Sequence, residues 1–175
     1  MAQNLKKIRA IAMDIDGVLT DGGLYPLENG DVLRRTDAKD AFAVRFASKK
    51  GLIMAIISGG DTVALHNRML QLKIREENIF LGCRGKLDVF RRFCEQNGLD
   101  ASEVAYFGDD IPDIQVLKAC GFGIVPADAV KEAAAAADHM TEACGGRGCV
   151  REGIEMILKS QGLWEFDPDR FSELY

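Results

Sequence analysis

The sequence is short of histidine, and it lacks paired cysteines. Its two histidines, His66 and His139, lie too far apart in the chain to predict a zinc site. Its five cysteines form no CxxC pair, and an odd number does not favour a complete set of disulfides. We therefore expect free thiols and no zinc centre.

Long hydrophobic runs and an excess of positive charge are also absent. The segment MAQNLKKIRAIAMDID contains basic residues, but its apolar run is short and ends in acids, unlike a signal peptide or a membrane-spanning helix. The 22 Lys and Arg are scattered among 27 Asp and Glu, with no basic block that would bind a nucleic-acid backbone. We expect a cytoplasmic protein whose partners include neither membranes nor nucleic acids.

What is present is the composition of a globular protein, with 175 residues of which 47% are hydrophobic and 28% charged. No linker or repeat divides the chain, so we expect one domain over residues 1–175. Short apolar runs alternate with stretches of helical pattern, which predicts an α/β fold with a doubly wound parallel sheet between two layers of helices. The expected strands are residues 8–13, 52–57, 79–81, 104–107 and 122–125, and the expected helices are 37–51, 61–72, 86–97, 127–137 and 150–161.

Residues 22–35, GGLYPLENGDVLRR, interrupt this alternation. Asn29 and Gly30 both suit positive φ, and they stand between two short apolar-polar stretches. The segment therefore predicts a β-hairpin that projects just after the first strand.

Polar residues follow four of the expected strands. In an open α/β sheet, ligands bind beyond the carboxyl ends of the strands. Any one of these turns is compatible with an ordinary loop and helix cap, but their joint occurrence favours a ligand site. The residues are Asp14 and Asp16, then Ser58, Gly59 and Gly60, then Gly82 to Lys86, then Gly108, Asp109 and Asp110.

The same residue types suit phosphoryl transfer assisted by a metal ion. Because side chains alternate along a strand, Asp14 and Asp16 can point the same way, and acids from two strands suit Mg²⁺. A carboxylate can act as the nucleophile if cations such as Lys86 and the metal neutralise the phosphoryl oxygens. A DxD pair alone would also suit a metal-dependent glycosyltransferase, but Lys86 and the GDDIPD segment favour a phosphatase. No GxGxxG or GxxxxGK[ST] motif supports a nucleotide-binding protein.

In order and spacing, these residues resemble the four motifs of the haloacid dehalogenase superfamily. The matching segments are DIDGVLTDGG from Asp14, Ser58, Lys86 and GDDIPD from Gly108. The chain is most similar to the small capless group that contains 3-deoxy-D-manno-octulosonate 8-phosphate phosphatase, from about Lys7 to Trp164. The resemblance implies a Rossmann-like fold without a cap domain, since the segments between the motifs are too short to hold one.

The resemblance also implies the role of each site residue. Asp14 would attack phosphorus and become an aspartyl phosphate, and Asp16 would act as general acid and then base. The ligands of Mg²⁺ would be the Asp14 carboxylate, the Asp16 carbonyl and Asp109. Ser58, Gly59 and Lys86 would bind the phosphoryl group, and Asp110 and Asp113 would orient Lys86 or the waters on the metal. Asp113 is equally suited to cap a helix that starts at Pro112.

The substrate implied by the resemblance is 3-deoxy-D-manno-octulosonate 8-phosphate, whose hydrolysis leads towards lipopolysaccharide. Many relatives have a larger charged residue where this chain has Gly60, which keeps nonulosonate 9-phosphates as an alternative substrate. A non-catalytic regulatory module of the same fold is a second alternative, although such a module would not need the complete set of acids and Lys86.

Contacts between subunits are implied as well. A homotetramer is expected, in which the hairpin covers the active site of a neighbour, although the apolar residues 24–27 could equally pack on their own subunit.

In the segment GGRGCVRE, Arg147 or Arg151 would bind the carboxylate of the substrate, or Arg151 would simply pair with Glu155. The tail of residues 160–175 could reach a neighbouring site or lie on its own subunit.

Overall fold

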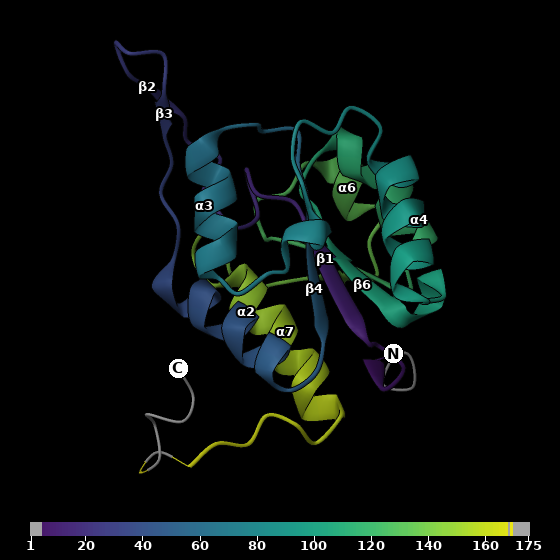
Figure 1. Ribbon diagram of the computed structural model, residues 1–175. Helices are drawn as coiled ribbons and strands as arrows, with labels where there is room; N and C mark the ends of the chain where they lie inside the picture. Colours follow the sequence, from purple (N-terminus) through teal and green to yellow (C-terminus); the bar gives the residue numbers. More distant parts are fainter. Residues whose placement is uncertain (1–4, 168, 170–175) are drawn as a thin grey trace.

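The computed structural model describes residues 5–167 and 169, and it contains a six-stranded sheet in which every neighbouring pair of strands is parallel. The strand order is β5-β4-β1-β6-β7-β8. Figure 1 labels the three central strands of this order, β4, β1 and β6. The strands are β1 Ala10–Met13, β4 Ile53–Ile57, β5 Ile79–Phe80, β6 Val104–Phe107, β7 Phe122–Val125 and β8 His139–Met140. The expected α/β architecture with a parallel sheet is therefore confirmed.

Helices cover both faces of the sheet, so the fold has three layers. Side chains alternate along β1: Ile11 and Met13 face one hydrophobic core, and Ala10 and Ala12 face the other. The first core is shared with α2 Ala38–Lys49, α3 Val63–Gln71 and α7 Cys149–Ser160, and the second with α4 Lys86–Asn97, α5 Ile114–Ala119 and α6 Lys131–Ala134. Three short 3₁₀ segments, η1 Glu76–Asn78, η2 Ala101–Glu103 and η3 Ile111–Asp113, complete the described elements.

Two elements were not expected, and one helix is shorter than expected. The six residues of α5 follow η3 directly, and the two residues of β8 pair with β7 at the edge of the sheet. The expected helix over 127–137 is wrong at both ends, because only Lys131–Ala134 is α-helical. Its first residues form a turn instead, in which the amide of Ala129 donates to the carbonyl of Pro126.

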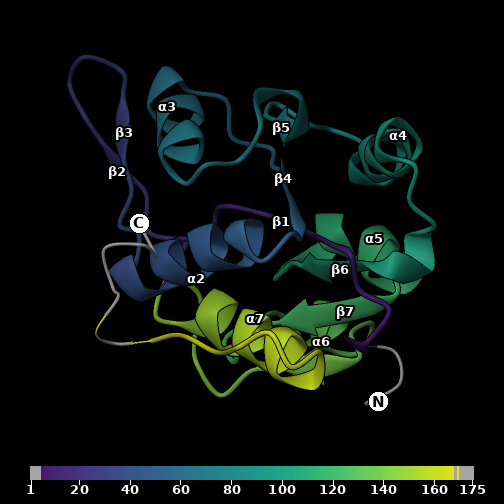
Figure 2. The ribbon, with the colours of Figure 1, turned by 60° about the horizontal axis from the view of Figure 1, so that its bottom comes forward.

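The hairpin consists of β2 Tyr25–Pro26 and β3 Val32–Leu33, which pair antiparallel. It projects from the body of the protein beside α3 (Figures 1 and 2). Within the connecting loop only Gly30 has positive φ, at +88°, so the turn is longer than a two-residue Asn-Gly turn. The hairpin is confirmed, and it places a two-stranded arm directly after β1.

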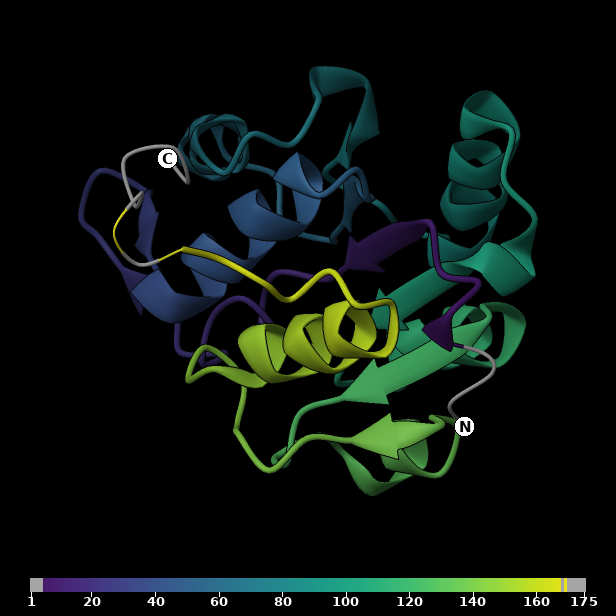
Figure 3. The same ribbon diagram turned by 90° about the horizontal axis from the view of Figure 1, so that it is seen from below.

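The described part of the C-terminal tail lies on its own subunit. The rings of Trp164 and Phe46 meet edge to face with centroids 5.1 Å apart, and Nζ of Lys50 donates to the carbonyl of Glu165 at 3.0 Å. Figure 3 shows this segment leaving α7, which packs along α2. The rest of the tail falls outside the described residues. Among the described helices, none has the length and apolar character needed to cross a membrane.

Candidate active site

A pocket of about 650 Å³ opens where β1, β4 and β6 end and where the loop after β5 meets α4. This is the edge at which the sequence predicts a ligand site. The structure brings together every residue predicted for that site except Arg147. The lining residues that were predicted for this edge are Asp14, Asp16, Ser58, Gly59, Gly60, Gly82, Cys83, Arg84, Lys86, Asp109, Asp110 and Asp113. Asp61 and Pro112 complete the lining.

The first residue of α4, Lys86, joins two buried acids. Its Nζ lies 2.6 Å from Oδ2 of Asp14 and 2.7 Å from Oδ1 of Asp113. Burial raises the pKa of Asp14, and the charge of Lys86 offsets this only in part. Burial alone would lower the pKa of Lys86, but the two carboxylates together raise it. Lys86 therefore stays protonated, and it holds Asp14 in one orientation.

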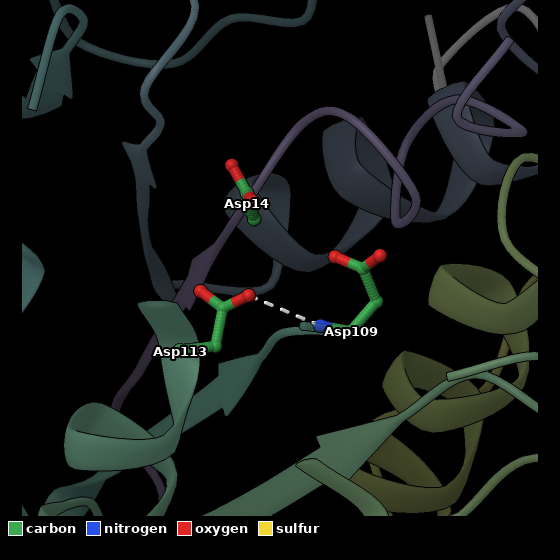
Figure 4. Close-up of side chains that lie close together, drawn as sticks. All are labelled: Asp14, Asp109 and Asp113. Carbon is green, nitrogen blue, oxygen red and sulfur yellow. Dashed lines mark hydrogen bonds between the residues drawn. The ribbon is translucent and has the colours of Figure 1, made fainter. Parts of the chain in front are cut away.

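Asp113 connects this ion pair to the loop after β6. Its Oδ2 accepts a hydrogen bond from the amide of Asp109 at 3.2 Å (Figure 4). Oδ2 also accepts from the amide of Asp110 at 3.3 Å, and Oδ1 accepts from the hydroxyl of Tyr106 at 2.6 Å. The two functions considered for Asp113 are thus combined, because it caps η3 and orients Lys86. Asp110 does not orient Lys86, because its side chain accepts from the amide of Ile111, whereas Lys86 donates to Asp14 and Asp113.

The acids of the pocket fit a divalent cation. Carboxylate oxygens of Asp14, Asp109 and Asp113 lie within 4.8 Å of one another (Figure 4). Oδ1 of Asp109 is buried, and it has no hydrogen-bond partner among the described residues. Burial, followed by the charges of Asp113 and Asp14, raises the pKa of Asp109 to about 7. A buried, unpartnered oxygen beside like charges is costly unless a cation neutralises it, and Mg²⁺ prefers such oxygen ligands.

Gly17 allows Asp109 to approach the turn after β1. Its φ is +86°, and a Cβ atom at this position would overlap the carboxylate of Asp109. Only glycine combines this backbone conformation with this close contact. The glycine of the DxDG motif therefore has a structural reason to follow the two acids directly.

Asp16 lines the pocket, and it is held by residues from outside the pocket. Nε of Arg34 donates to Oδ1 of Asp16 at 2.7 Å, Nη2 donates to Oδ2 at 3.1 Å, and the hydroxyl of Thr20 donates to Oδ1 at 3.3 Å. Arg34 was not predicted from the sequence. The expected hairpin was the available signal, because it returns the chain to the end of β1 just where Arg34 stands.

Ser58 and Gly59 form the next part of the pocket. Ser58 is buried at the end of β4, and its Oγ accepts a hydrogen bond from the amide of Gly60 at 3.3 Å. A second cation, Arg84, lines the same pocket, although no role was assigned to it from the sequence. Its side chain is exposed and forms no ion pair with any described residue. The pocket thus offers a hydroxyl, a glycine and two cations, Lys86 and Arg84, to an anionic ligand.

Neither candidate arginine of the GGRGCVRE segment lines this pocket. Nη2 of Arg147 lies 3.6 Å from Oδ2 of Asp21, and the Arg147 side chain is 59% exposed. Nε of Arg151 lies 3.4 Å from Oε2 of Glu155, as the alternative interpretation of the sequence predicts. Within one subunit, the structure therefore separates Arg147 from the other predicted site residues.

Buried Asp40 fixes the segment that precedes α7. Its Oδ2 accepts from the amide of Gly148 at 3.1 Å, and its Oδ1 accepts from the amide of Arg151 at 2.7 Å. These bonds satisfy free N–H groups at the N-terminus of α7 with a side chain from α2. Burial raises the pKa of Asp40 to about 6, although both amides act in the opposite direction.

Comparison with known proteins shows the family to which the chain belongs. Residues 85–144 match the haloacid dehalogenase-like hydrolase family. The chain is 35% identical to the 3-deoxy-D-manno-octulosonate 8-phosphate phosphatase KdsC of Haemophilus influenzae, over 93% of this chain and 89% of that protein. It is 34% identical to KdsC of Escherichia coli strain K12, over 90% of this chain and 82% of that protein.

A solved structure is similar over nearly the whole chain. The 3-deoxy-D-manno-octulosonate 8-phosphate phosphatase of Moraxella catarrhalis, in complex with magnesium, phosphate and a KDO molecule, matches with a TM-score of 0.89 and 32% identity. The match covers 98% of this chain and 95% of that one. The chain therefore belongs to the haloacid dehalogenase-like hydrolases, in the family of the 3-deoxy-D-manno-octulosonate 8-phosphate phosphatases, and is a phosphoric monoester hydrolase.

Proposed function

We propose that this chain is a Mg²⁺-dependent phosphatase that hydrolyses 3-deoxy-D-manno-octulosonate 8-phosphate to the free sugar acid and phosphate, on the route to lipopolysaccharide. The observation that carries the proposal is the buried cluster of Asp14, Lys86, Asp109 and Asp113 at the edge of the sheet. The relative from Moraxella catarrhalis supports it, because that protein was crystallised with magnesium, phosphate and KDO.

Asp14 is the proposed nucleophile. Its Oδ1 accepts from the amide of Ile15 at 2.7 Å and its Oδ2 accepts from Lys86 at 2.6 Å, so both oxygens are fixed in direction. One Asp14 oxygen bonds to phosphorus while the bond from phosphorus to the sugar oxygen breaks. Asp16 protonates the leaving sugar oxygen and then takes a proton from the water that hydrolyses the aspartyl phosphate.

The other site residues bind the ion and the transferred group. The Asp14 and Asp109 carboxylates and the Asp16 carbonyl would hold Mg²⁺, which supplies positive charge to the phosphoryl oxygens when it is bound. Lys86 supplies a second positive charge, and Asp113 keeps it directed at Asp14. The Ser58 hydroxyl and the Gly59 amide donate hydrogen bonds to the phosphoryl group.

A homotetramer is proposed to complete the site. Leu24 and Tyr25 on the hairpin are 52% and 65% exposed, and Leu27 and Leu33 add to the same apolar surface. Burial of this surface on a second copy would cover a pocket for which the described residues provide no cap domain. In such an assembly, the exposed Arg147 would bind the substrate carboxylate in the pocket of a neighbour.

The glycine at position 60 is the reason to test a second substrate. Since Gly60 has no side chain to contact the sugar, nonulosonate 9-phosphates are the alternative substrates of the same reaction. Steady-state kinetics with 3-deoxy-D-manno-octulosonate 8-phosphate and with a nonulosonate 9-phosphate, each with and without Mg²⁺, distinguish the two substrates. The proposal expects a higher kcat/KM for the octulosonate ester and no turnover without the metal. Failure to hydrolyse that ester would refute the substrate assignment.

A further inference from the structure

Arg34 holds the proposed acid-base residue by two parallel hydrogen bonds. Its guanidinium reaches both oxygens of Asp16, at 2.7 and 3.1 Å, and the Arg34 side chain is only 11% exposed. Such paired contacts fix the plane of a carboxylate as well as its distance. Arg34 does not line the pocket, whereas Asp16 does, so the guanidinium supports Asp16 from behind.

The space around this ion pair is available because residue 60 is glycine. A Cβ atom at Gly60 would lie 3.5 Å from Nη2 of Arg34 and 3.5 Å from Oδ2 of Asp16. It would also lie 3.0 Å from Cδ1 of Leu65, at the flexible end of that side chain. A methyl group fits there with a small adjustment, but a longer side chain would enter the space that the guanidinium occupies.

We propose that Arg34 is a positioning residue that orients Asp16 for proton transfer, and that Gly60 leaves the room for this contact. The inference rests on the proposed function, because it takes Asp16 as the acid that protonates the leaving sugar oxygen. Arg34 directly follows the hairpin strand β3. The hairpin therefore acts on the active site of its own subunit, whatever it contacts in a neighbour.

The inference predicts a dependence on the leaving group. A sugar alkoxide is a poor leaving group and needs a proton from Asp16, whereas p-nitrophenolate leaves readily without one. A misdirected Asp16 should therefore slow phosphoryl transfer from the sugar ester to Asp14, which kcat/KM reports, and spare the same step with p-nitrophenyl phosphate. Hydrolysis of the aspartyl phosphate, in which Asp16 is the base, is common to both esters and does not enter kcat/KM. A merely structural role of Arg34 would lower kcat/KM alike for both esters.

The test compares Arg34→Met and Arg34→Lys with the wild-type enzyme on both esters. For Arg34→Met we expect kcat/KM on the sugar ester to fall roughly 10- to 100-fold, and kcat/KM on p-nitrophenyl phosphate to fall less than about 3-fold. Arg34→Lys should recover only part of the loss, because an ammonium group cannot make the paired contact. In an Asp16→Asn background, Arg34→Met should cause no further loss of kcat/KM on the sugar ester. Equal losses of kcat/KM on both esters, or a further loss without Asp16, would overturn the inference.

Two further variants serve as controls. Arg35→Met removes the neighbouring arginine, which contacts Asp21 and Asp37 rather than Asp16, and should leave the ratio of the two rates unchanged. Gly60→Ala, whose methyl group fits beside the ion pair, should also leave the ratio unchanged. Activity on p-nitrophenyl phosphate shows that each variant is folded.

The substrate assignment is checked separately on the wild-type enzyme. If it hydrolyses another sugar phosphate but not the octulosonate ester, the proposed substrate is wrong, and the Arg34 comparison is made on the ester that is hydrolysed. If the wild-type enzyme hydrolyses p-nitrophenyl phosphate but no sugar phosphate, Asp16 does not protonate a sugar oxygen and the inference is overturned as well.

Discussion

Nζ of Lys86 lies 2.6 Å from Oδ2 of Asp14, so the proposed nucleophile is one half of a buried ion pair. The same Nζ lies 2.7 Å from Oδ1 of Asp113 and also balances the negative charge of that carboxylate. Lys86→Met would leave two buried carboxylates without their cation. We expect the free energy of unfolding in urea to fall by about 3–5 kcal/mol.

The matched control for this prediction is Lys131→Met, since the Lys131 side chain is 90% exposed. Its effect on the unfolding free energy should stay within about 0.5 kcal/mol. A similarly small effect for Lys86→Met would show that Asp14 and Asp113 do not depend on Lys86 for their burial.

Asp109 should lower the stability of the apoprotein, and it should be required for much of the stabilisation by magnesium. Its carboxylate, with a pKa raised to about 7, is charged and poorly compensated at pH 8. We therefore expect Asp109→Asn to raise the melting temperature at pH 8 in the presence of EDTA, and to reduce the further increase caused by Mg²⁺. An equal increase with Mg²⁺ in the variant and the wild type would show that Asp109 is not a ligand.

Much of this site could be predicted because its residues follow strands that the sequence marks clearly. Val104–Phe107 and Phe122–Val125 are uninterrupted apolar runs, and the structure has strands with the same bounds. The helix Lys86–Asn97 also has its expected bounds, because Gly98 ends it with a left-handed φ of +61°. Such signals are local, so the sequence alone contains them.

The features that were missed depend on contacts between distant residues. Arg34 reaches Asp16 only because the hairpin folds back, and nothing in the segment LRR distinguishes it from Arg35. The two-residue strand β8 is too short to show a pattern and forms only beside β7. Tertiary structure, rather than local propensity, determines these features.

The pKa of Asp40 predicts a dependence of stability on pH. The folded state binds this proton more tightly than the unfolded chain, because the pKa is about 6 in the fold and 3.8 ordinarily. The stabilisation is therefore complete below pH 3.8 and is lost as pH rises to about 6. Unfolding free energies of the wild type and Asp40→Asn should differ by an amount that falls by up to about 1.4 kcal/mol per pH unit over this range and is constant above it.

Asp88→Asn provides the comparison for Asp40, because the Asp88 side chain is 87% exposed. The pH dependence measured for this exposed carboxylate is subtracted from that of Asp40→Asn. A constant remaining difference for Asp40→Asn would mean that Asp40 titrates normally in the folded protein.

The hairpin should be necessary for the proposed tetramer. The double variant Tyr25→Ser, Leu33→Ser removes two side chains that are 65% and 56% exposed. Sedimentation velocity should show a tetramer for the wild type that persists on dilution, and smaller species with lower activity for the variant. Val63→Ser, which replaces a residue that is 77% exposed outside the hairpin, should leave the tetramer intact. Fully active wild-type monomers would contradict the proposed assembly.

The most direct test of the account is the rate of Asp14→Asn on 3-deoxy-D-manno-octulosonate 8-phosphate with saturating Mg²⁺. The substitution keeps the shape of the side chain and removes the charge that attacks phosphorus. We predict that kcat falls by a factor on the order of 10³ or more, with the folded structure retained in circular dichroism. A folded Asp14→Asn enzyme with a rate near that of the wild type would contradict the account, because the nucleophile would then lie elsewhere.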